Sequence, residues 1–478
     1  MGRIADAGRE FFINFTMPIK IATAFFLIAF TFSCVKIPEE KETPLINEMQ
    51  NVILMTLNPG HFHAALIQKT MYPEIDSTAY VFAPEGADVA DFLGKIDSYN
   101  GRDENPTDWN TEVYLGDDFL SKMIDQKSGN VMIVAGKNDK KIDYILAAVK
   151  AGVNVYADKP LVINQEGFEK LEEVFKIAEE KGVVVYDIMT ERFEETTAMQ
   201  KQFSMSLEVF GELIDGTPEA PAISKESVHH FSKIVSGKPL TRPAWFFDVE
   251  QEGEGIIDVT THLVDLVQWE AFSEQIIRRT DVEILKAKHW TTTLTPKEFE
   301  KVTKLTKFPD YLQKDVIRGN LNVLCNGEIL YKIKGKYAKV SVVWNFEAPA
   351  GTGDTHYSIM RGTKADLIIK QGEAEGYKPT LYIQLKNSDN GSKILQKAIA
   401  ERIKNVFDGT TVEQVSADVW KVNIDDKYKL GHEAHFAQVT RNYLDYLKAG
   451  KLPKWEISNM LTKYYTTTAA YQMAQKTP

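Results

Sequence analysis

Short apolar runs alternate with segments of helical spacing in the first part of the chain. The runs at 51–57 (NVILMTL), 131–135 (VMIVA), 153–157 (VNVYA) and 183–186 (VVVY) show almost no polar alternation, and apolar residues recur at helical spacing over 142–149. Strands without polar alternation, separated by helices, are typical of a parallel sheet that is covered on both faces. The pattern therefore predicts an α/β domain built on a parallel sheet.

The loops that follow these strands are where we expect a ligand to bind. An open parallel sheet binds ligands at the carboxyl ends of its strands, and the loops at 58–63, 136–139 and 157–160 all fall at that edge. The alternation then ends, and longer loops with β-rich runs follow. The sequence thus predicts a first domain over 50–188 and a second, α+β domain over 189–478.

An apolar stretch near the start resembles the core of a secretory signal peptide. Residues 21–32 (IATAFFLIAFTF) are too few to span a bilayer, which needs about 20 apolar residues. Ser33 before Cys34 resembles a bacterial lipobox, where cleavage leaves a lipid-bearing cysteine. We therefore expect a signal peptide over 1–33 and a polar tether over 34–49.

This interpretation predicts an exported, lipid-anchored protein at a bacterial cell envelope, on the periplasmic or surface side. Two or more acyl chains are enough to hold a protein stably at a bilayer surface. The alternative is a short buried helix in which Cys34 is incidental.

Composition and charge narrow the range of partners and sites. The chain has 478 residues, with 56 basic and 67 acidic side chains and a formal net charge of −11. Nucleic acid is not an expected partner, because phosphate binding needs a basic face. Two cysteines, Cys34 and Cys325, exclude a disulfide framework and any multi-cysteine metal site.

A dinucleotide-binding loop after the first strand is only partly present. Such a loop reads G-x-G-x-x-G, because glycines let the backbone approach the pyrophosphate at a helix N-terminus. The corresponding segment 58–63 reads NPGHFH and keeps only Gly60. The acidic residue that usually holds the adenosine ribose is missing, and Glu85 is the only nearby candidate. The segment alone is equally compatible with an ordinary strand–helix turn.

Two later segments carry a stronger chemical signal. Residues 157–161 (ADKPL) lie between a predicted strand and a predicted helix, so the ammonium group of Lys159 would sit over a nicotinamide ring. Residues 253–266 (GEGIIDVTTHLVDL) place Asp258 and His262 four positions apart, on one face if the segment is helical. A carboxylate one turn from an imidazole can tune that imidazole toward base catalysis at neutral pH.

Each of these three side chains also has a simpler interpretation. Lys159 could be a solvated turn residue, and Asp258 could cap the start of a helix, a position that aspartate favours. His262 could be an interior histidine with its hydrogen bonds satisfied.

Together the two segments resemble the glucose–fructose oxidoreductase and inositol dehydrogenase family, often called Gfo/Idh/MocA. The family pattern is a strand followed by Glu-Lys-Pro, then a glycine-rich stretch that leads into Asp-x-x-x-His. Residues 158–160 match with Asp in place of Glu, and the second motif matches directly at Gly253, Gly255, Asp258 and His262. The resemblance implies a Rossmann-type parallel-sheet domain followed by an α+β domain with a large, open, mainly antiparallel sheet.

The resemblance also implies a cofactor and roles for individual residues. Lys159 would position and polarise the reacting hydroxyl or carbonyl, and His262, oriented by Asp258, would take the hydroxyl proton while hydride passes to a tightly bound NAD or NADP. The residues expected to contact the cofactor are Asn58, Gly60, His61, Phe62, Asn138, Asp158 and Lys159. Those expected to contact a saccharide or polyol substrate are His230, Arg192 and His435. The open sheet would carry the substrate pocket and, in a homo-oligomer, the contact between copies.

The remaining histidines give no metal motif, and we predict no metal site. His432 and His435 lie in the sequence HEAH, which is one residue short of the H-E-x-x-H of zinc metalloproteases. His61 and His63 would border the pyrophosphate of the cofactor or cap the helix that follows.

Three functions remain compatible with this sequence. The favoured one is a nicotinamide-dependent oxidoreductase that acts on a sugar, polyol or glycoside. A glycosidase or lyase with a redox-neutral NAD cycle is the first alternative, because an envelope compartment without free NAD offers no cofactor recycling. A carbohydrate-binding lipoprotein that has lost its cofactor is the second, and the reduced glycine loop favours it.

Overall fold

The computed structural model describes residues 51–235 and 238–476, and residues 49–478 form one unit. The predicted signal peptide over 1–33 and the whole tether over 34–49, with Cys34, lie outside the described residues, so the lipoprotein hypothesis stays a prediction. None of the helices in the described part of the chain is long and apolar enough to cross a membrane.

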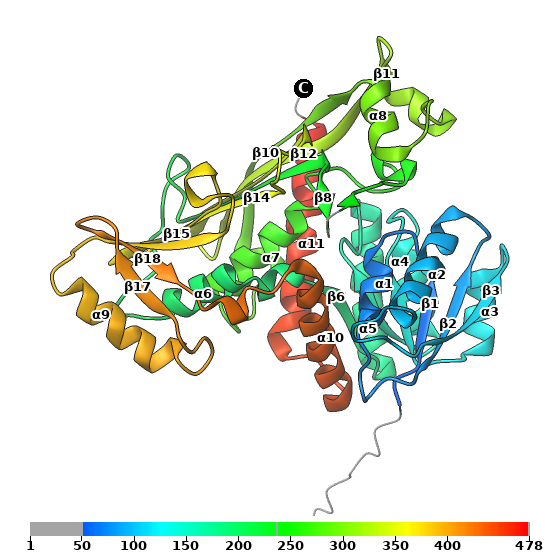
Figure 1. The fold of residues 1–478 in the computed structure, drawn as a ribbon, viewed down its shortest axis with the longest axis horizontal. Helices are drawn as coiled ribbons and strands as arrows, with labels where there is room; N and C mark the ends of the chain where they lie inside the picture. Colours follow the sequence, from blue (N-terminus) through cyan, green and yellow to red (C-terminus); the bar gives the residue numbers. More distant parts are fainter. Residues whose placement is uncertain (1–50, 236–237, 477–478) are drawn as a thin grey trace, which may run out of the picture. The chain divides into compact units, whose positions relative to one another are not determined.

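The first six strands form the predicted parallel sheet (Figure 1), in the order β3-β2-β1-β4-β5-β6. Every neighbouring pair is parallel, and β1, β4 and β6 are buried along their whole length, as expected for apolar runs covered on both faces. The strands are β1 (Leu54–Leu57), β2 (Thr78–Ala83), β3 (Asn110–Leu115), β4 (Val131–Val134), β5 (Asn154–Asp158) and β6 (Val185–Ile188). The helices between them are α1 (His63–Leu66), α2 (Ala87–Asn100), α3 (Phe119–Gln126), α4 (Lys141–Lys150) and α5 (Gln165–Lys181).

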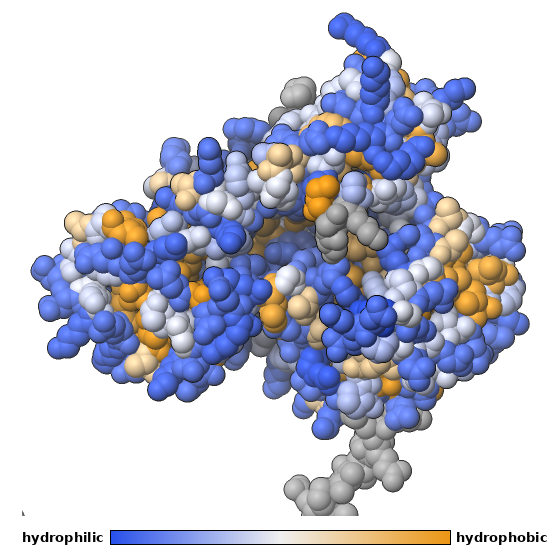
Figure 2. All heavy atoms as spheres, viewed as in Figure 1, coloured by the Kyte–Doolittle hydropathy of each residue, from blue (hydrophilic) through white to orange (hydrophobic). Residues whose placement is uncertain are grey.

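The apolar pattern did not predict β3. This strand lies at the edge of the sheet and pairs only with β2, so its side chains are mostly exposed or half-buried. Val113 and Leu115 are 43% and 41% exposed, and Figure 2 shows apolar side chains gathered on this edge. β3 lacks the continuous apolar run by which the buried strands were predicted, including β6 at the opposite edge.

The second sheet has ten strands, as expected for a large, mainly antiparallel sheet. Only β7 and β13 run parallel, and burial alternates along β12 because one face packs against helices. The strands are β7 (Ile223–Ser232), β10 (Val282–Leu294), β11 (Val316–Ile317), β12 (Asn320–Ile333), β13 (Lys336–Glu347), β14 (Thr355–Arg361), β15 (Ala365–Lys370), β16 (Thr380–Leu385), β17 (Thr411–Gln414) and β18 (Val419–Asn423). A two-stranded ribbon joins β8 (Ile234–Val235) to β9 (Lys238–Pro239).

The last helix connects the two hydrophobic cores. Met460 and Tyr464 of α11 (Lys454–Gln475) belong to the core of the parallel-sheet domain, whereas Ala470 and Ala474 belong to the core under the large sheet. The C-terminal end of the chain therefore packs against both domains. The other helices of this half are α6 (Glu195–Ser204), α7 (Thr260–Ala271), α8 (Pro296–Thr303), α9 (Gly391–Ala398) and α10 (His432–Ala449).

A buried network of charged side chains lies between α7, α11 and the end of the parallel sheet. Arg192 donates to Asp265 on α7 at 2.7 Å and to Glu456 on α11 at 2.8 Å. Lys463 lies 2.8 Å from Asp187 on β6 and 2.9 Å from Asp265. All five residues are at most 7% exposed. The network therefore ties α7 to both α11 and β6.

We predict that Asp265→Asn lowers the free energy of unfolding by about 3–5 kcal/mol, because it leaves buried cations without their partner. Burial alone would raise the pKa of Asp265, but the guanidinium of Arg192 and the ammonium of Lys463 hold it well below its ordinary value of 3.8. The stabilisation is therefore present above that ordinary pKa and is lost as the pH falls below it.

Urea unfolding of the parent and the variant as a function of pH measures this effect. The difference should be constant above about pH 5 and shrink on acidification below about pH 4. Asp91→Asn, which removes an exposed pair with Lys95, is the control and should change stability little. An equally small effect of Asp265→Asn would contradict the assignment.

Candidate active site

Lys159 directly follows β5 and faces α7. Its ammonium group hydrogen-bonds Asp258, and the Lys159–Pro160 peptide bond is cis. The fully buried Lys141, in the first turn of α4, donates to the carbonyl oxygens of Asp158 and Pro160 at 2.9 and 3.1 Å. Lys141 thus fixes the backbone on both sides of Lys159, and burial lowers its own pKa to about 8.

Asp258 and His262 lie at the start of α7, as the sequence indicated, but Asp258 precedes the helix. Helix α7 begins at Thr260, and its first residues receive no side-chain cap. The carboxylate of Asp258 pairs with Lys159 instead, so the N-cap interpretation has no support here.

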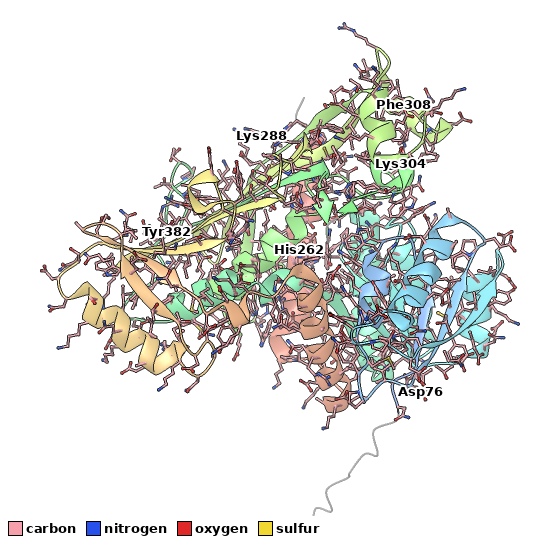
Figure 3. The ribbon with its side chains drawn as sticks, viewed as in Figure 1. Asp76, His262, Lys288, Lys304, Phe308 and Tyr382 are labelled. Carbon is pink, nitrogen blue, oxygen red and sulfur yellow. The ribbon has the colours of Figure 1, made fainter. Side chains whose placement is uncertain are left out.

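His262 lies in the first turn of α7, in the middle of Figure 3. Its Nδ1 is buried and has no hydrogen-bond partner among the described residues. Burial and, next, the positive charge of Lys159 lower its pKa well below 6.5, so the ring is neutral at physiological pH. A neutral imidazole with an unpartnered nitrogen is suited to accept a proton.

A close backbone contact sets the position of these two residues. The amide of Gly255 donates to the carbonyl of Leu324 on β12 at 3.0 Å. A Cβ at position 255 would lie 1.7 Å from the carbonyl oxygen of Cys325, and one at Gly327 would lie 2.6 Å from Ile256. Neither position has room for a side chain, so the two glycines allow the segment before Asp258 to pack directly against the large sheet.

The loop at 58–63 packs closely against Gly136 and carries side chains that the dinucleotide pattern lacks. Asn58 adopts a left-handed conformation with φ 43°, which asparagine tolerates better than most residues. Gly60 approaches Gly136, and a Cβ on Gly60 would lie 3.3 Å from the ring of Trp245. The amides of Gly60 and His61 both donate to the carbonyl of Ala135, at 3.0 and 3.2 Å.

His61 and His63 converge with Asp158 on the same side of this loop. The distance from His63 Nδ1 to Asp158 Oδ2 is 2.9 Å, and that from His61 Nδ1 to the same oxygen is 3.6 Å. The ring of Phe62 contacts the His61 ring in a tilted arrangement and the His63 ring edge-on. Burial lowers the pKa of both histidines well below 6.5, so both rings are neutral.

Asn138 joins the parallel-sheet domain to the segment that leads to α7. Its amide group donates to the carbonyl and the carboxylate of Glu252, at 2.7 and 3.2 Å, and its backbone amide donates to Gln251. Its buried Oδ1 has no partner among the described residues. Burial raises the pKa of Glu252 well above 4.5, and the nearby Asp258 adds to the shift.

His230, predicted to contact substrate, belongs to a polar group on the large sheet. Its backbone amide donates to Asp354 at 3.0 Å, and its Nδ1 lies 3.4 Å from the same carboxylate. His229 also contacts Asp354, at 3.0 Å, as does the ammonium group of Lys233. Burial would raise the pKa of Asp354, but these neighbours, His229 first, hold it far below its usual range.

The other two substrate candidates lie elsewhere. Arg192 makes four hydrogen bonds to Asp265 and Glu456 within the buried network, so its guanidinium is already occupied. His435 is 5% exposed, and its Nε2 has no partner among the described residues. Contact of either residue with substrate stays a prediction.

His432, discussed above only for the HEAH segment, and Glu191, which was not predicted, approach the site instead. His432 Nε2 lies 3.5 Å from His63 Nε2, and His432 Nδ1 lies 3.7 Å from the carboxylate of Glu191. Burial and the nearby Glu194 raise the pKa of Glu191 to about 7. A titratable group shifted to neutral pH beside other polar residues is typical of a functional site. No local sequence signal identifies either residue.

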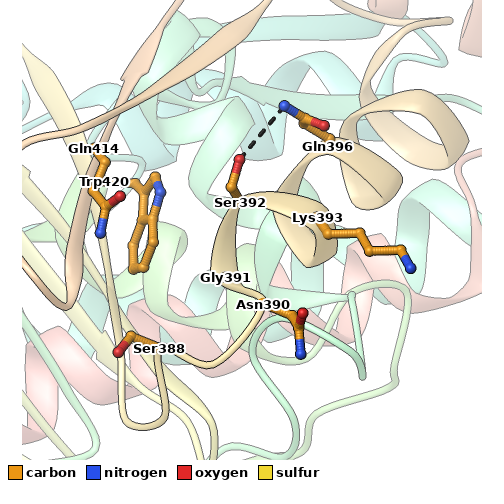
Figure 4. Close-up of a pocket in the computed structure, with 8 residues that line it drawn as sticks. All are labelled: Ser388, Asn390, Gly391, Ser392, Lys393, Gln396, Gln414 and Trp420. Carbon is orange, nitrogen blue, oxygen red and sulfur yellow. Dashed lines mark hydrogen bonds between the residues drawn. The ribbon is translucent and has the colours of Figure 1, made fainter.

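A separate surface hollow of about 410 Å³ lies where α9 begins (Figure 4). It is lined mainly by exposed polar side chains, with the edge of Trp420 behind them. It shares no residue with the site around Lys159.

Comparison with protein families matches both domains. Residues 84–188 match the family described as "Oxidoreductase family, NAD-binding Rossmann fold", and residues 199–475 match the "Putative oxidoreductase C terminal domain". The second match alone covers more than half of the chain. The chain belongs to this oxidoreductase family. The first match begins after the loop at 58–63, the part that departs most from the dinucleotide pattern.

Solved structures agree with the assignment to this oxidoreductase family. A "putative oxidoreductase" from Parabacteroides merdae is 53% identical, covers 90% of this chain and 98% of its own, and has a TM-score of 0.87. A "putative oxidoreductase" from Thermotoga maritima (12% identity, 89% and 99% covered) and levoglucosan dehydrogenase with NADH (12%, 89% and 98%) both have a TM-score of 0.58 and show the fold alone. The search of curated proteins found no match. The protein is thus an NAD(P)-dependent oxidoreductase of this family.

The residues at the nicotinamide end fit such a cofactor. Asn138 Oδ1 and His262 Nδ1 are buried polar atoms without partners among the described residues, and Lys159 lies near His262. Gly60 has no side chain, but Trp245 and Asp88 both lie 3.3 Å from the position that its Cβ would take. At the phosphate end, Asn58 and His63 replace two of the three glycines, and the amides of Gly60 and His61 are already used by Ala135.

We predict that Gly255→Ala lowers the free energy of unfolding by about 1–3 kcal/mol or more. The added Cβ would overlap the Cys325 carbonyl and force α7 away from β12. Thermal unfolding measures the loss. Gly353→Ala is the matched control, because nothing lies within 4 Å of a Cβ at that position. Equal stability of the two variants would contradict the close contact.

Proposed function

We propose that this oxidoreductase transfers hydride between a nicotinamide cofactor and a carbon of a sugar, polyol or glycoside, with Lys159, Asp258 and His262 as its acid–base groups. The observation that carries the proposal is the pairing of Lys159 with Asp258 one turn from a neutral His262. The three side chains come from two domains, and only the fold brings them together.

The chemistry follows from the charge and protonation state of each group. The ammonium group of Lys159 orients and polarises the substrate hydroxyl, and Asp258 holds that ammonium in place. His262 accepts the hydroxyl proton, because its lowered pKa keeps the ring neutral. A bound nicotinamide would supply the hydride acceptor, held by the 58–63 loop, Asn138 and Lys159. In the reverse reaction His262 returns the proton to the carbonyl oxygen.

The substrate class is supported by proteins of the same fold. Levoglucosan dehydrogenase has been solved with NADH and levoglucosan, and with NADH and L-sorbose. These structures show that the fold accommodates a dinucleotide beside a small saccharide. In this chain, the polar group around Asp354 with His229 and His230 offers donors and acceptors to such a substrate.

A cofactor-free carbohydrate-binding protein is the alternative favoured by a specific observation. The amides of Gly60 and His61 already bond Ala135, and the ring of Trp245 packs beside Gly60. A redox-neutral glycosidase or lyase would use the same three catalytic groups. Net accumulation of reduced cofactor identifies a dehydrogenase, whereas product without net reduction identifies the redox-neutral cycle.

We expect Lys159→Ala and His262→Ala each to lower kcat/KM by about 10²- to 10⁴-fold, because each removes a group that acts on the reacting hydroxyl. Nicotinamide absorbance during a screen of sugars and glycosides provides the assay. Lys288→Ala, an exposed lysine on β10 (Figure 3), is the control and should keep parent activity. Parent activity in Lys159→Ala would contradict the proposed site.

We also propose that Cys34 is lipidated after removal of 1–33, which would anchor the protein at the cell envelope. Free NAD is absent from such a compartment, so a tightly held cofactor would be required. Cys34→Ser should move the protein from the membrane fraction to the soluble fraction and abolish labelling by radioactive fatty acid. Unchanged fractionation and labelling would contradict lipidation at Cys34.

A further inference from the structure

The cluster of His61, His63 and Asp158 has the composition and spacing of a metal site. Its three ligand atoms, Nδ1 of each histidine and a carboxylate oxygen, lie within 4.8 Å of one another. Neighbouring ligands of a tetrahedral ion with bonds of 2.0–2.1 Å are separated by about 3.3 Å. The two distances to Asp158 Oδ2, 2.9 and 3.6 Å, lie on either side of that value.

The proposed reaction does not use these imidazoles. In a dinucleotide loop, residues at these positions present backbone amides or lack a side chain, because the pyrophosphate needs the space. Here two rings from one loop converge on a carboxylate 95 positions away in sequence from His63. Among the described residues, His63 Nδ1 pairs with Asp158, and His61 Nδ1 accepts only a long hydrogen bond, 3.4 Å, from the backbone amide of His63.

The other ring nitrogen of His63 has a polar neighbour, as metal-binding histidines commonly do. This nitrogen, Nε2, lies 3.5 Å from His432 Nε2, and His432 in turn faces Glu191. Of the cations nearby, Lys159 pairs with Asp258 and Lys233 with Asp354, while Lys141 is held by two backbone carbonyls. The cluster is largely buried, with side chains 18%, 10% and 6% exposed for His61, His63 and Asp158.

We propose that His61, His63 and Asp158 bind one divalent first-row transition-metal ion, such as Zn²⁺, at the cofactor loop. Two imidazoles and one carboxylate are a ligand set that such ions favour, and three protein ligands leave coordination positions open to oxygen donors. Because Asp158 directly precedes Lys159, the ion would stand beside the catalytic group and polarise an oxygen that enters there.

Metal titration of the full-length protein tests the site without cofactor or substrate. After treatment with a chelator, the protein is titrated with Co²⁺ and followed by visible absorption, and metal content is measured after incubation with Zn²⁺. We expect one equivalent of tightly bound metal and the visible absorption spectrum of a Co²⁺ ion with a low coordination number. This readout is independent of the proposed reaction, so the two can fail separately.

Two variants identify the ligands. His61→Ala and Asp158→Asn should each weaken metal binding strongly. The loss should exceed the roughly 10- to 100-fold that follows when a residue that only hydrogen-bonds a metal ligand is removed. His61 is the most exposed ligand, so its variant decides the question if Asp158→Asn does not fold. His289→Ala, which removes a histidine that pairs with the single carboxylate of Glu254, should bind metal like the parent.

The proposal is overturned if the parent takes up less than one equivalent of Zn²⁺ or Co²⁺. It is equally overturned if His61→Ala binds either metal with parent affinity.

Discussion

The buried charges around Arg192 and Lys463 determine where the catalytic groups stand. Asp265 on α7 is bound by both cations, and the same cations bind Glu456 on α11 and Asp187 at the end of β6. Helix α7 carries His262 on its first turn, so its distance from the loop after β5 depends on this network. A misplaced α7 would separate His262 from Lys159.

Two further contacts complete this arrangement. Gly255 and Gly327 let the segment before α7 pack against the large sheet, which fixes the start of the helix. Lys141 holds the backbone around Lys159 through two hydrogen bonds. The active-site groups are therefore set by backbone contacts and by buried ion pairs, including the pair between Lys159 and Asp258. Such preorganisation is what hydride and proton transfer require of a protein scaffold.

The sequence predicted what local patterns encode. Apolar runs identified buried strands of the parallel sheet, and the two motifs supplied Lys159 and Asp258, which the fold joins across 99 positions. Edge strand β3 and the packing of α11 against both cores have no such local pattern. Arg192, expected at the substrate, is instead enclosed by carboxylates from α7 and α11. His432 reaches the site only because α10 returns to the first domain, and Glu191 lies there because it closely follows β6. No spacing in the sequence reveals that these two residues meet.

The central claim is that the site around Lys159 holds a nicotinamide cofactor. Mass spectrometry and absorbance of the ligand released on denaturation of the purified protein, followed by titration with NAD(H) and NADP(H), test it most directly. We predict either a stoichiometric amount of dinucleotide in the released fraction or saturable binding of NAD(H) or NADP(H) to the emptied protein. No released dinucleotide, together with no binding at millimolar concentration, would contradict it and leave a binding protein on an oxidoreductase fold.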